Sequence, residues 1–123
     1  MKLEILYATV TGNAEAVANK IKEIAINGAL KIKELALANP ETDWSFEYSP
    51  ESFTGTELDY AAEVCDSVVD ILKVVSKHKI IINLPATVEM STPNIYGDQI
   101  EWMNKNLKNR KNISLSLHPH NDR

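Results

Sequence analysis

The sequence is short of several features, and each shortage excludes a class of protein. A single cysteine, Cys65, excludes an intramolecular disulfide and is typical of a reducing compartment. It falls on an apolar helical stripe, so we expect a buried thiol rather than a reactive one. No apolar run approaches the ~20 residues of a membrane span, and nothing resembles a signal peptide. We therefore expect a soluble protein in the cytoplasm of its expression host, without a membrane partner.

Basic residues are also in the minority. The chain has 13 Lys and Arg against 17 Asp and Glu, which gives a formal net charge of -4. Nucleic-acid binding needs clustered cations that face the phosphates, so we expect no nucleic-acid partner. The basic stretch at residues 105–111 lies at the end of a helical pattern, where the helix dipole favours cations.

What is present is an alternation of strand-like and helix-like segments. Strand patterns at residues 3–8, 44–48, 80–82 and 113–117 are separated by apolar stripes of helical period. This β-α-β-α-β-α-β order predicts one α/β domain over residues 1–123, with a four-stranded parallel sheet. Two helix starts are also visible: Thr54 and Glu57 have the spacing of a capping box, and Thr92-Pro93 places a proline at the first helical position.

The loop after the first predicted strand combines hydroxyls, a glycine and an amide. Its members are Thr9, Thr11, Gly12 and Asn13. Backbone N–H groups and the positive end of the following helix can hold a phosphate in such a loop. The plain alternative is an ordinary strand-to-helix turn, with Asn or Thr as the N-cap.

Polar side chains also follow the later strands, at the sheet edge where α/β proteins bind ligands. The second and third strand ends carry Ser49, Glu51, Asn83 and Thr87, with Pro85 between the last two. The fourth strand ends in His118 and His120, whose spacing puts both imidazoles on one side of the strand. Imidazole binds zinc and similar metals, but a complete site needs further ligands. From spacing alone, a metal and oxyacid site and a purely structural role are equally acceptable.

Three longer motifs cover these strand ends. They are FEYSPESFTGTE at residues 46–57, NLPATVEMSTPN at 83–94 and SLHPHNDR at 116–123. From about residue 24 to the end, the chain resembles 2-isopropylmalate synthase, a TIM-barrel metalloenzyme family that condenses acetyl-CoA with 2-ketoisovalerate. By this resemblance, His118 and His120 match the family's metal-binding His-x-His. Five residues match its keto-acid pocket: Ser49, Glu51, Asn83, Pro85 and Thr87.

The first part of the chain resembles a different family. Residues 6–18, LYATVTGNAEAVA, are similar to the first strand and phosphate loop of flavodoxin-like FMN proteins. The resemblance implies phosphate contacts from Thr9, Thr11, Gly12 and Asn13, although Ala14 replaces the usual closing hydroxyl. Two resemblances that meet at about residues 18–25, inside the first helix, predict an engineered, recombined or generated chimera without evolved catalytic function.

The resemblances also set expectations for activity and assembly. The synthase's strand-one aspartate and acetyl-CoA site have no counterpart, so we expect no enzyme activity and no required cofactor. The alternative is a binding module with weak affinity for FMN, phosphate or a divalent metal such as zinc or manganese. We expect the flavodoxin-like strand order 2-1-3-4 in a monomer. The alternative order 1-2-3-4 is a half-barrel, whose bare inner face predicts a homodimer.

Overall fold

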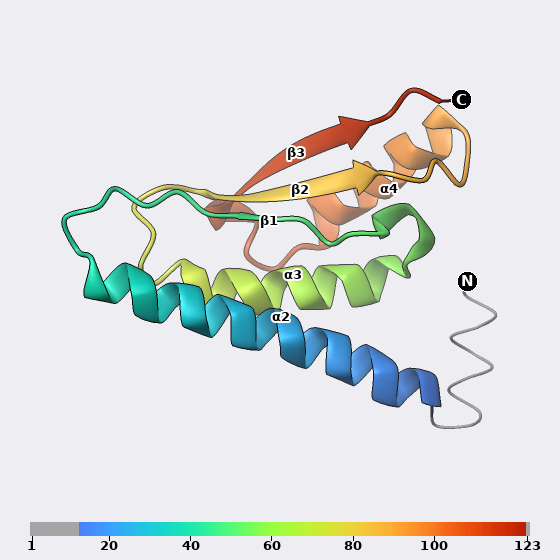
Figure 1. The fold of residues 1–123 in the computed structure, drawn as a ribbon. Coiled ribbons are helices and arrows are strands. Elements are labelled where there is room, and N and C mark those ends of the chain that lie inside the picture. Colours follow the sequence, from blue (N-terminus) through green and yellow to red (C-terminus); the bar gives the residue numbers. More distant parts are fainter. Residues whose placement is uncertain (1–12, 123) are drawn as a thin grey trace.

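A three-stranded parallel sheet carries the fold in the computed structural model, which describes residues 13–122 (Figure 1). Helices α3 and α4 pack on one side of the sheet, and α2 runs alongside α3. The predicted strand at residues 3–8 lies outside the described residues, as do Thr9, Thr11 and Gly12. Asn13 is the first residue of α2, and its side chain is not described.

Helix α2, Asn13–Ala38, confirms the predicted long first helix. Its regular backbone continues through Gly28, which therefore interrupts the side-chain pattern without breaking the helix. The helix ends where the Asn39 side-chain amide donates to the Leu35 carbonyl oxygen over 2.8 Å, and Pro40 follows. A proline disfavours helical conformation in the residue before it, so the sequence prevents further extension.

The second predicted strand and the predicted capping box both differ from expectation. Strand β1 is only Glu47–Tyr48, and a 3-10 helix, η1, Phe53–Gly55, follows it. Thr54 lies in this 3-10 helix, where its hydroxyl donates to the Val88 carbonyl oxygen over 2.6 Å. Glu57 is the N-cap of helix α3 but makes no side-chain capping hydrogen bond. The capping-box prediction is wrong because Thr54 is engaged by a loop distant in sequence.

The remaining elements follow the predicted order. After β1 and η1 come four longer elements and a 3-10 helix. They are α3 at Leu58–Leu72, β2 at Ile80–Ala86, α4 at Pro93–Asn106, η2 at Arg110–Asn112 and β3 at Ile113–Pro119. Pro93 occupies the predicted position at the start of α4, with Thr92 as N-cap. The Thr92 hydroxyl donates to the Asn94 side-chain oxygen over 2.6 Å and not to a backbone group. Both long strands extend further than predicted, towards the polar residues at their ends.

The strand order corrects the expected topology. Strand β2 pairs in parallel with β1 on one side and with β3 on the other, in the order β1-β2-β3. The flavodoxin-like order is wrong, because it would place the first predicted strand between β1 and β2. Those two strands pair directly, with Glu47 opposite Ile81 and Tyr48 opposite Ile82. Parallel strands that are adjacent in chain order and connected by helices are the arrangement of a partial TIM barrel.

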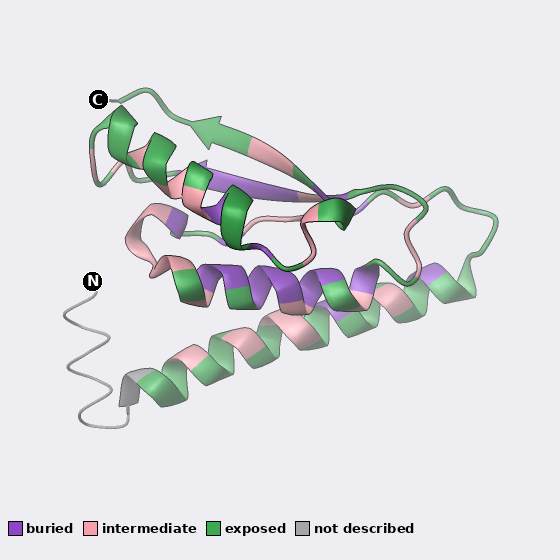
Figure 2. Ribbon diagram, turned by 180° about the vertical axis from the view of Figure 1, so that it is seen from behind, coloured by how far each residue is buried: buried purple, intermediate pink, exposed green. Residues whose placement is uncertain are grey.

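The core lies between the sheet and the helices α3 and α4, as the burial pattern of Figure 2 shows. Its largest fully buried side chains include Phe53, Ile80, Ile82, Leu84, Met103 and Ile113. Cys65 belongs to this core, and burial raises the pKa of its thiol to about 12, which confirms the expectation of an unreactive cysteine. Across residues 13–122, no helix combines the length and apolar character that crossing a bilayer requires.

Candidate functional site

The three parallel strands end at one edge of the sheet, and the polar residues predicted there lie close together. β2 and β3 remain in register up to the last pairs, Pro85 opposite His118 and Ala86 opposite Pro119. In parallel α/β sheets this carboxyl edge is the usual place for ligands, because the loops that follow the strands converge there. The edge is therefore the candidate functional site.

Two hydrogen bonds join the end of β1 to the end of β2. The Asn83 side-chain amide donates to the Ser49 hydroxyl oxygen over 3.1 Å. Asn83 is only 8% exposed, and this partner offsets the cost of burying its amide. Further along, the Thr87 hydroxyl donates to a Glu51 carboxylate oxygen over 3.3 Å. The structure thus brings together four of the five residues that resemble a keto-acid pocket, as two pairs.

The fifth of these residues, Pro85, connects the two pairs to the histidines. It is fully buried in β2, and it lies directly opposite His118 in the register with β3. His118 is within β3, and His120 follows the end of the strand. The predicted keto-acid residues and the predicted metal ligands therefore share one sheet edge.

The two imidazoles lie side by side, with ring centroids 5.2 Å apart and planes tilted by 31°. Two imidazoles that share one tetrahedral zinc have ring centres about 5 Å apart when each nitrogen is ~2.1 Å from the metal. The donor type and the separation both fit a divalent metal. Residues 13–122 contain no group of three or more His, Cys, Asp and Glu side chains arranged around a common metal position.

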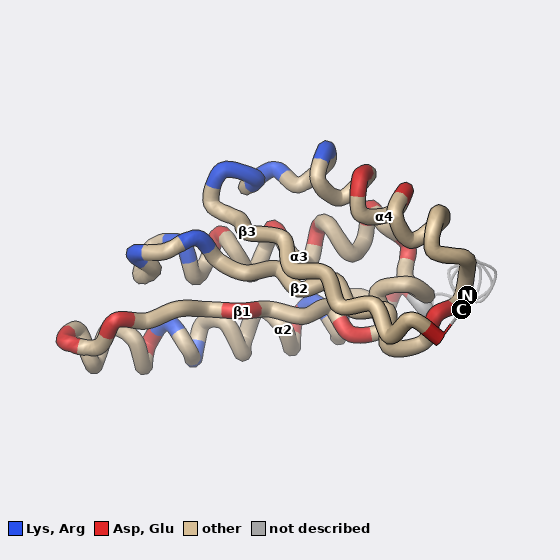
Figure 3. Tube along the Cα trace, turned by 90° about the horizontal axis from the view of Figure 1, so that it is seen from above, with Lys and Arg blue, Asp and Glu red and all other residues tan. Residues whose placement is uncertain are grey.

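Charge at this edge favours a cation. The strand-end segments 49–56, 83–92 and 116–122 contain acidic residues but no Lys or Arg. The basic residues of the loops before β2 and β3 lie at the opposite end of the molecule (Figure 3). A bound cation at this edge would attract a negatively charged ligand such as an oxyacid.

Two residues at this edge escaped the sequence-based prediction. The Glu89 carboxylate accepts backbone hydrogen bonds from the segment that follows β3. Tyr96 of α4 donates its hydroxyl to the Leu84 carbonyl oxygen over 2.6 Å. Burial raises the pKa of Tyr96, and a backbone hydrogen bond at His118 acts in the opposite direction. Both contacts join segments far apart in sequence, so no local spacing could have indicated them.

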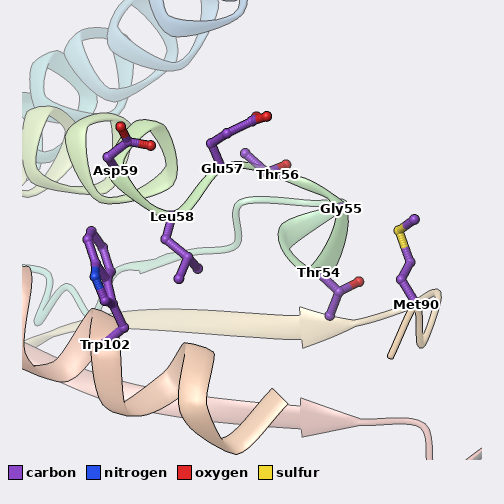
Figure 4. A pocket seen from close by; sticks show the side chains of 8 residues that line it. All are labelled: Thr54, Gly55, Thr56, Glu57, Leu58, Asp59, Met90 and Trp102. Atoms are coloured by element: carbon purple, nitrogen blue, oxygen red, sulfur yellow. The ribbon is translucent and has the colours of Figure 1, made fainter. Parts of the chain in front are cut away.

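Two hollows border this edge. One, of about 490 Å³, is lined by residues 54–59, Met90 and Trp102 (Figure 4). Figure 4 shows Met90 and Trp102 on opposite sides of it and the Glu57 carboxylate directed away from Trp102. A second, of about 460 Å³, is bordered by Ser49 and Glu51 and by apolar side chains of α2, including Ile21 and Ile24.

The fold and the site together define an α/β protein of partial-barrel architecture with a polar, histidine-bearing carboxyl edge. A family model described as HMGL-like matches residues 1–123, and the chain belongs to this family.

Relatives named 2-isopropylmalate synthase support the same assignment. The protein from Acetoanaerobium sticklandii is 66% identical over 101 residues, 82% of this chain and 18% of the relative. The protein from Ralstonia pickettii is 59% identical over 103 residues, 84% of this chain and 18% of the relative. The protein from Mycobacterium ulcerans is 54% identical over 119 residues, 97% of this chain and 21% of the relative. The chain spans 18% to 21% of the length of these relatives.

These matches overturn the prediction of an engineered chimera without evolved function. The family model runs through residues 18–25, where a junction was expected, and the Mycobacterium ulcerans match covers 97% of the chain. The flavodoxin-like resemblance has no support. It rested on one strand-to-helix turn with hydroxyls and a glycine, and such turns occur in many α/β proteins because the same residues suit any tight turn.

Proposed function

We propose that the chain provides the keto-acid and divalent-metal binding part of an enzyme of the 2-isopropylmalate synthase type. The observation that carries this proposal is the convergence, at one sheet edge, of the Ser49–Asn83 and Glu51–Thr87 pairs with the His118/His120 pair. The first two pairs join the ends of β1 and β2, and the histidines come from the end of β3. Residues from several strand ends are usual for active sites in barrels.

In this proposal the histidines hold the metal through neutral imidazole nitrogens. A metal bound there would polarise the oxygens of a 2-oxo acid and neutralise its carboxylate. His118 is fixed by its place in β3, so its ring has a defined position relative to the β2 end. The metal would also favour anion binding, because the Glu51 carboxylate at this edge repels a carboxylate.

The two hydrogen-bonded pairs provide orientation and selectivity. The Glu51 carboxylate accepts a hydrogen bond from the Thr87 hydroxyl and so orients it, and the lone pairs of the hydroxyl oxygen remain available. Asn83 and Ser49 form a fixed polar wall nearer the sheet. Preorganised polar groups of this kind discriminate strongly between ligands, because a ligand that lacks the complementary group leaves them unpaired. The reaction that joins an acetyl group to the 2-oxo acid is attributed to the enzyme as a whole.

Zinc titration of the chain, followed by calorimetry, tests the metal site. We expect His118→Ala combined with His120→Ala to weaken zinc binding by more than roughly tenfold, since both ligands are lost. His78→Ala is the matched control, because His78 is exposed and pairs with Asp43 away from this edge. In the zinc-loaded chain, Thr87→Val should weaken 2-ketoisovalerate binding. Zinc binding that is unchanged in the double variant, or lost equally in His78→Ala, would refute the proposal.

A further inference from the structure

A carboxylate surrounded by backbone N–H groups lies next to the histidine pair. Glu89, in the loop after β2, accepts hydrogen bonds from three consecutive amides. One oxygen accepts from His120 over 3.1 Å and from Asn121 over 2.7 Å, and the other accepts from Asp122 over 2.8 Å. Hydrogen bonds to an ionised acceptor are about twice as strong as neutral ones, so this contact fixes the segment firmly.

The backbone of this segment has the shape that converging amides need. Asn121 has a φ of 60°, in the left-handed region, where asparagine is tolerated better than most residues. A left-handed residue among right-handed or extended neighbours turns successive N–H groups towards one point and forms a concave anion site, a nest. Here the chain's own Glu89 fills the nest. The left-handed conformation of Asn121 directs the N–H groups towards the Glu89 carboxylate, and their hydrogen bonds to that carboxylate stabilise this conformation.

This contact constrains the histidines from one side, and the sheet constrains them from the other. His118 is held by the ladder between β3 and β2, where it lies opposite Pro85. Pro119 restricts the backbone between the two histidines, because its ring fixes φ. His120 lies beyond the strand, and the Glu89 contact at its backbone N–H holds it there. Without Glu89, His118 would keep its position and His120 would lose its anchor.

We propose that Glu89 is a positioning residue for divalent-metal binding by His118 and His120. This inference rests on the proposed function, because it assumes that the two imidazoles share a metal. Glu89 acts through the backbone of residues 120–122, with its carboxylate committed to N–H donors, and it maintains the 5.2 Å separation of the imidazoles. The metal class is a borderline divalent cation such as zinc, which suits imidazole nitrogen.

The test compares Glu89→Ala, Glu89→Gln and wild-type chains in zinc titrations, with amide hydrogen exchange at residues 120–122. We expect Glu89→Ala to weaken zinc binding roughly 10- to 100-fold and to accelerate exchange of the three amides. Glu89→Gln keeps one accepting oxygen and should give intermediate values. Added acetate, whose carboxylate can occupy the vacated nest, should partly restore both properties in Glu89→Ala and should not affect the wild type.

A matched control removes a carboxylate elsewhere. Glu101→Ala deletes an exposed glutamate of α4 that pairs with Lys105, and it should leave zinc binding unchanged. Faster exchange in Glu89→Ala with unchanged, histidine-dependent zinc binding would show that Glu89 only shapes the loop, and would overturn the positioning role alone. An equal loss in Glu101→Ala would overturn it as well, as a general charge effect. Zinc binding that is independent of His118 and His120 would overturn both this inference and the proposed function.

Discussion

Among single residues, Asp66 shows how one buried carboxylate can hold two distant segments together. It lies in α3, is only 6% exposed, and accepts the backbone N–H groups of Lys108 and Asn109, each over 3.0 Å. The Asn109 side-chain amide also donates to it over 3.2 Å. Asp66 thereby fastens the turn between α4 and β3 to α3, and this turn sets where β3 begins.

Removing this carboxylate leaves part-buried backbone donors without their acceptor. We predict that Asp66→Ala lowers the free energy of unfolding by about 3 kcal/mol, because hydrogen bonds to charged groups contribute ~1.5–3 kcal/mol each and the orphaned amides add a penalty. Urea denaturation should show a lower midpoint with an unchanged slope. Asp66→Asn keeps one accepting oxygen and should lose less. Asp59→Ala, an exposed change in the same helix, should cost under about 1 kcal/mol; equal losses for Asp59→Ala and Asp66→Ala would contradict this account.

Among the elements, α2 contains an unfavourable residue, a glycine inside the helix, whose replacement by alanine should stabilise the chain. Gly28 is an exposed residue inside this 26-residue helix, and a Cβ built there meets nothing within 4 Å. Glycine inside a helix is less favourable than alanine by about 1 kcal/mol, mostly through the entropy of the unfolded chain. We predict that Gly28→Ala raises the free energy of unfolding by roughly 0.5–1 kcal/mol. The measurement is again the urea midpoint.

Gly97 offers an independent repeat of this comparison in α4. It too is exposed, and a Cβ there also meets nothing within 4 Å, so Gly97→Ala should give a gain of similar size. The reverse change Ala29→Gly, at a buried position of α2, should destabilise the chain through lost packing as well as entropy. If neither glycine replacement stabilises the chain, the helices are not limited by backbone entropy at these positions.

The elements also show why periodicity predicted some features and not others. α2, α3 and α4 were predictable because a helical stripe and a stop such as Asn39-Pro40 are local properties of the chain. The role of Thr54 was not predictable, since its hydroxyl donates to the carbonyl oxygen of Val88, 34 positions away. Strand-end polar residues were found because parallel strands share one carboxyl edge, whereas the Glu89 contact depends on a backbone turn at Asn121 that no spacing reveals.

For the whole molecule, strand order was the property that the sequence left open. Both candidate orders satisfy the same β-α-β alternation, and a short turn motif favoured the wrong one. The direct pairing of Glu47 with Ile81 decides between them, and this contact depends on tertiary packing rather than on any local pattern. The long motifs around the strand ends predicted the family better than the short N-terminal loop did. A long motif specifies many residues at once, whereas the few residues of a tight turn occur in many α/β proteins.

The order of the strands has a consequence for assembly. Within residues 13–122, β3 pairs only with β2, so its outer edge presents backbone N–H and C=O groups. Leu117 on this strand is 52% exposed, and α2 exposes Val17 and Ile24 as well. Unpaired edges and exposed apolar side chains favour association. The half-barrel alternative predicted a homodimer on a different ground, the bare inner face of the sheet. We therefore propose that the 123-residue chain, when studied on its own, forms a homodimer through the β3 edge.

Light scattering coupled to size-exclusion chromatography over a wide range of protein concentrations tests this proposal. We predict a mass that rises from monomer to dimer, with a dissociation constant that Leu117→Lys raises by about tenfold or more, since lysine on an edge strand opposes pairing. Val74→Lys is the matched control: Val74 is 66% exposed, and it follows α3 and is not part of the sheet. A mass that stays monomeric at every concentration contradicts the dimer. An equal effect of Val74→Lys would show instead that association depends on overall charge, and that the free edge of β3 has no special part in it.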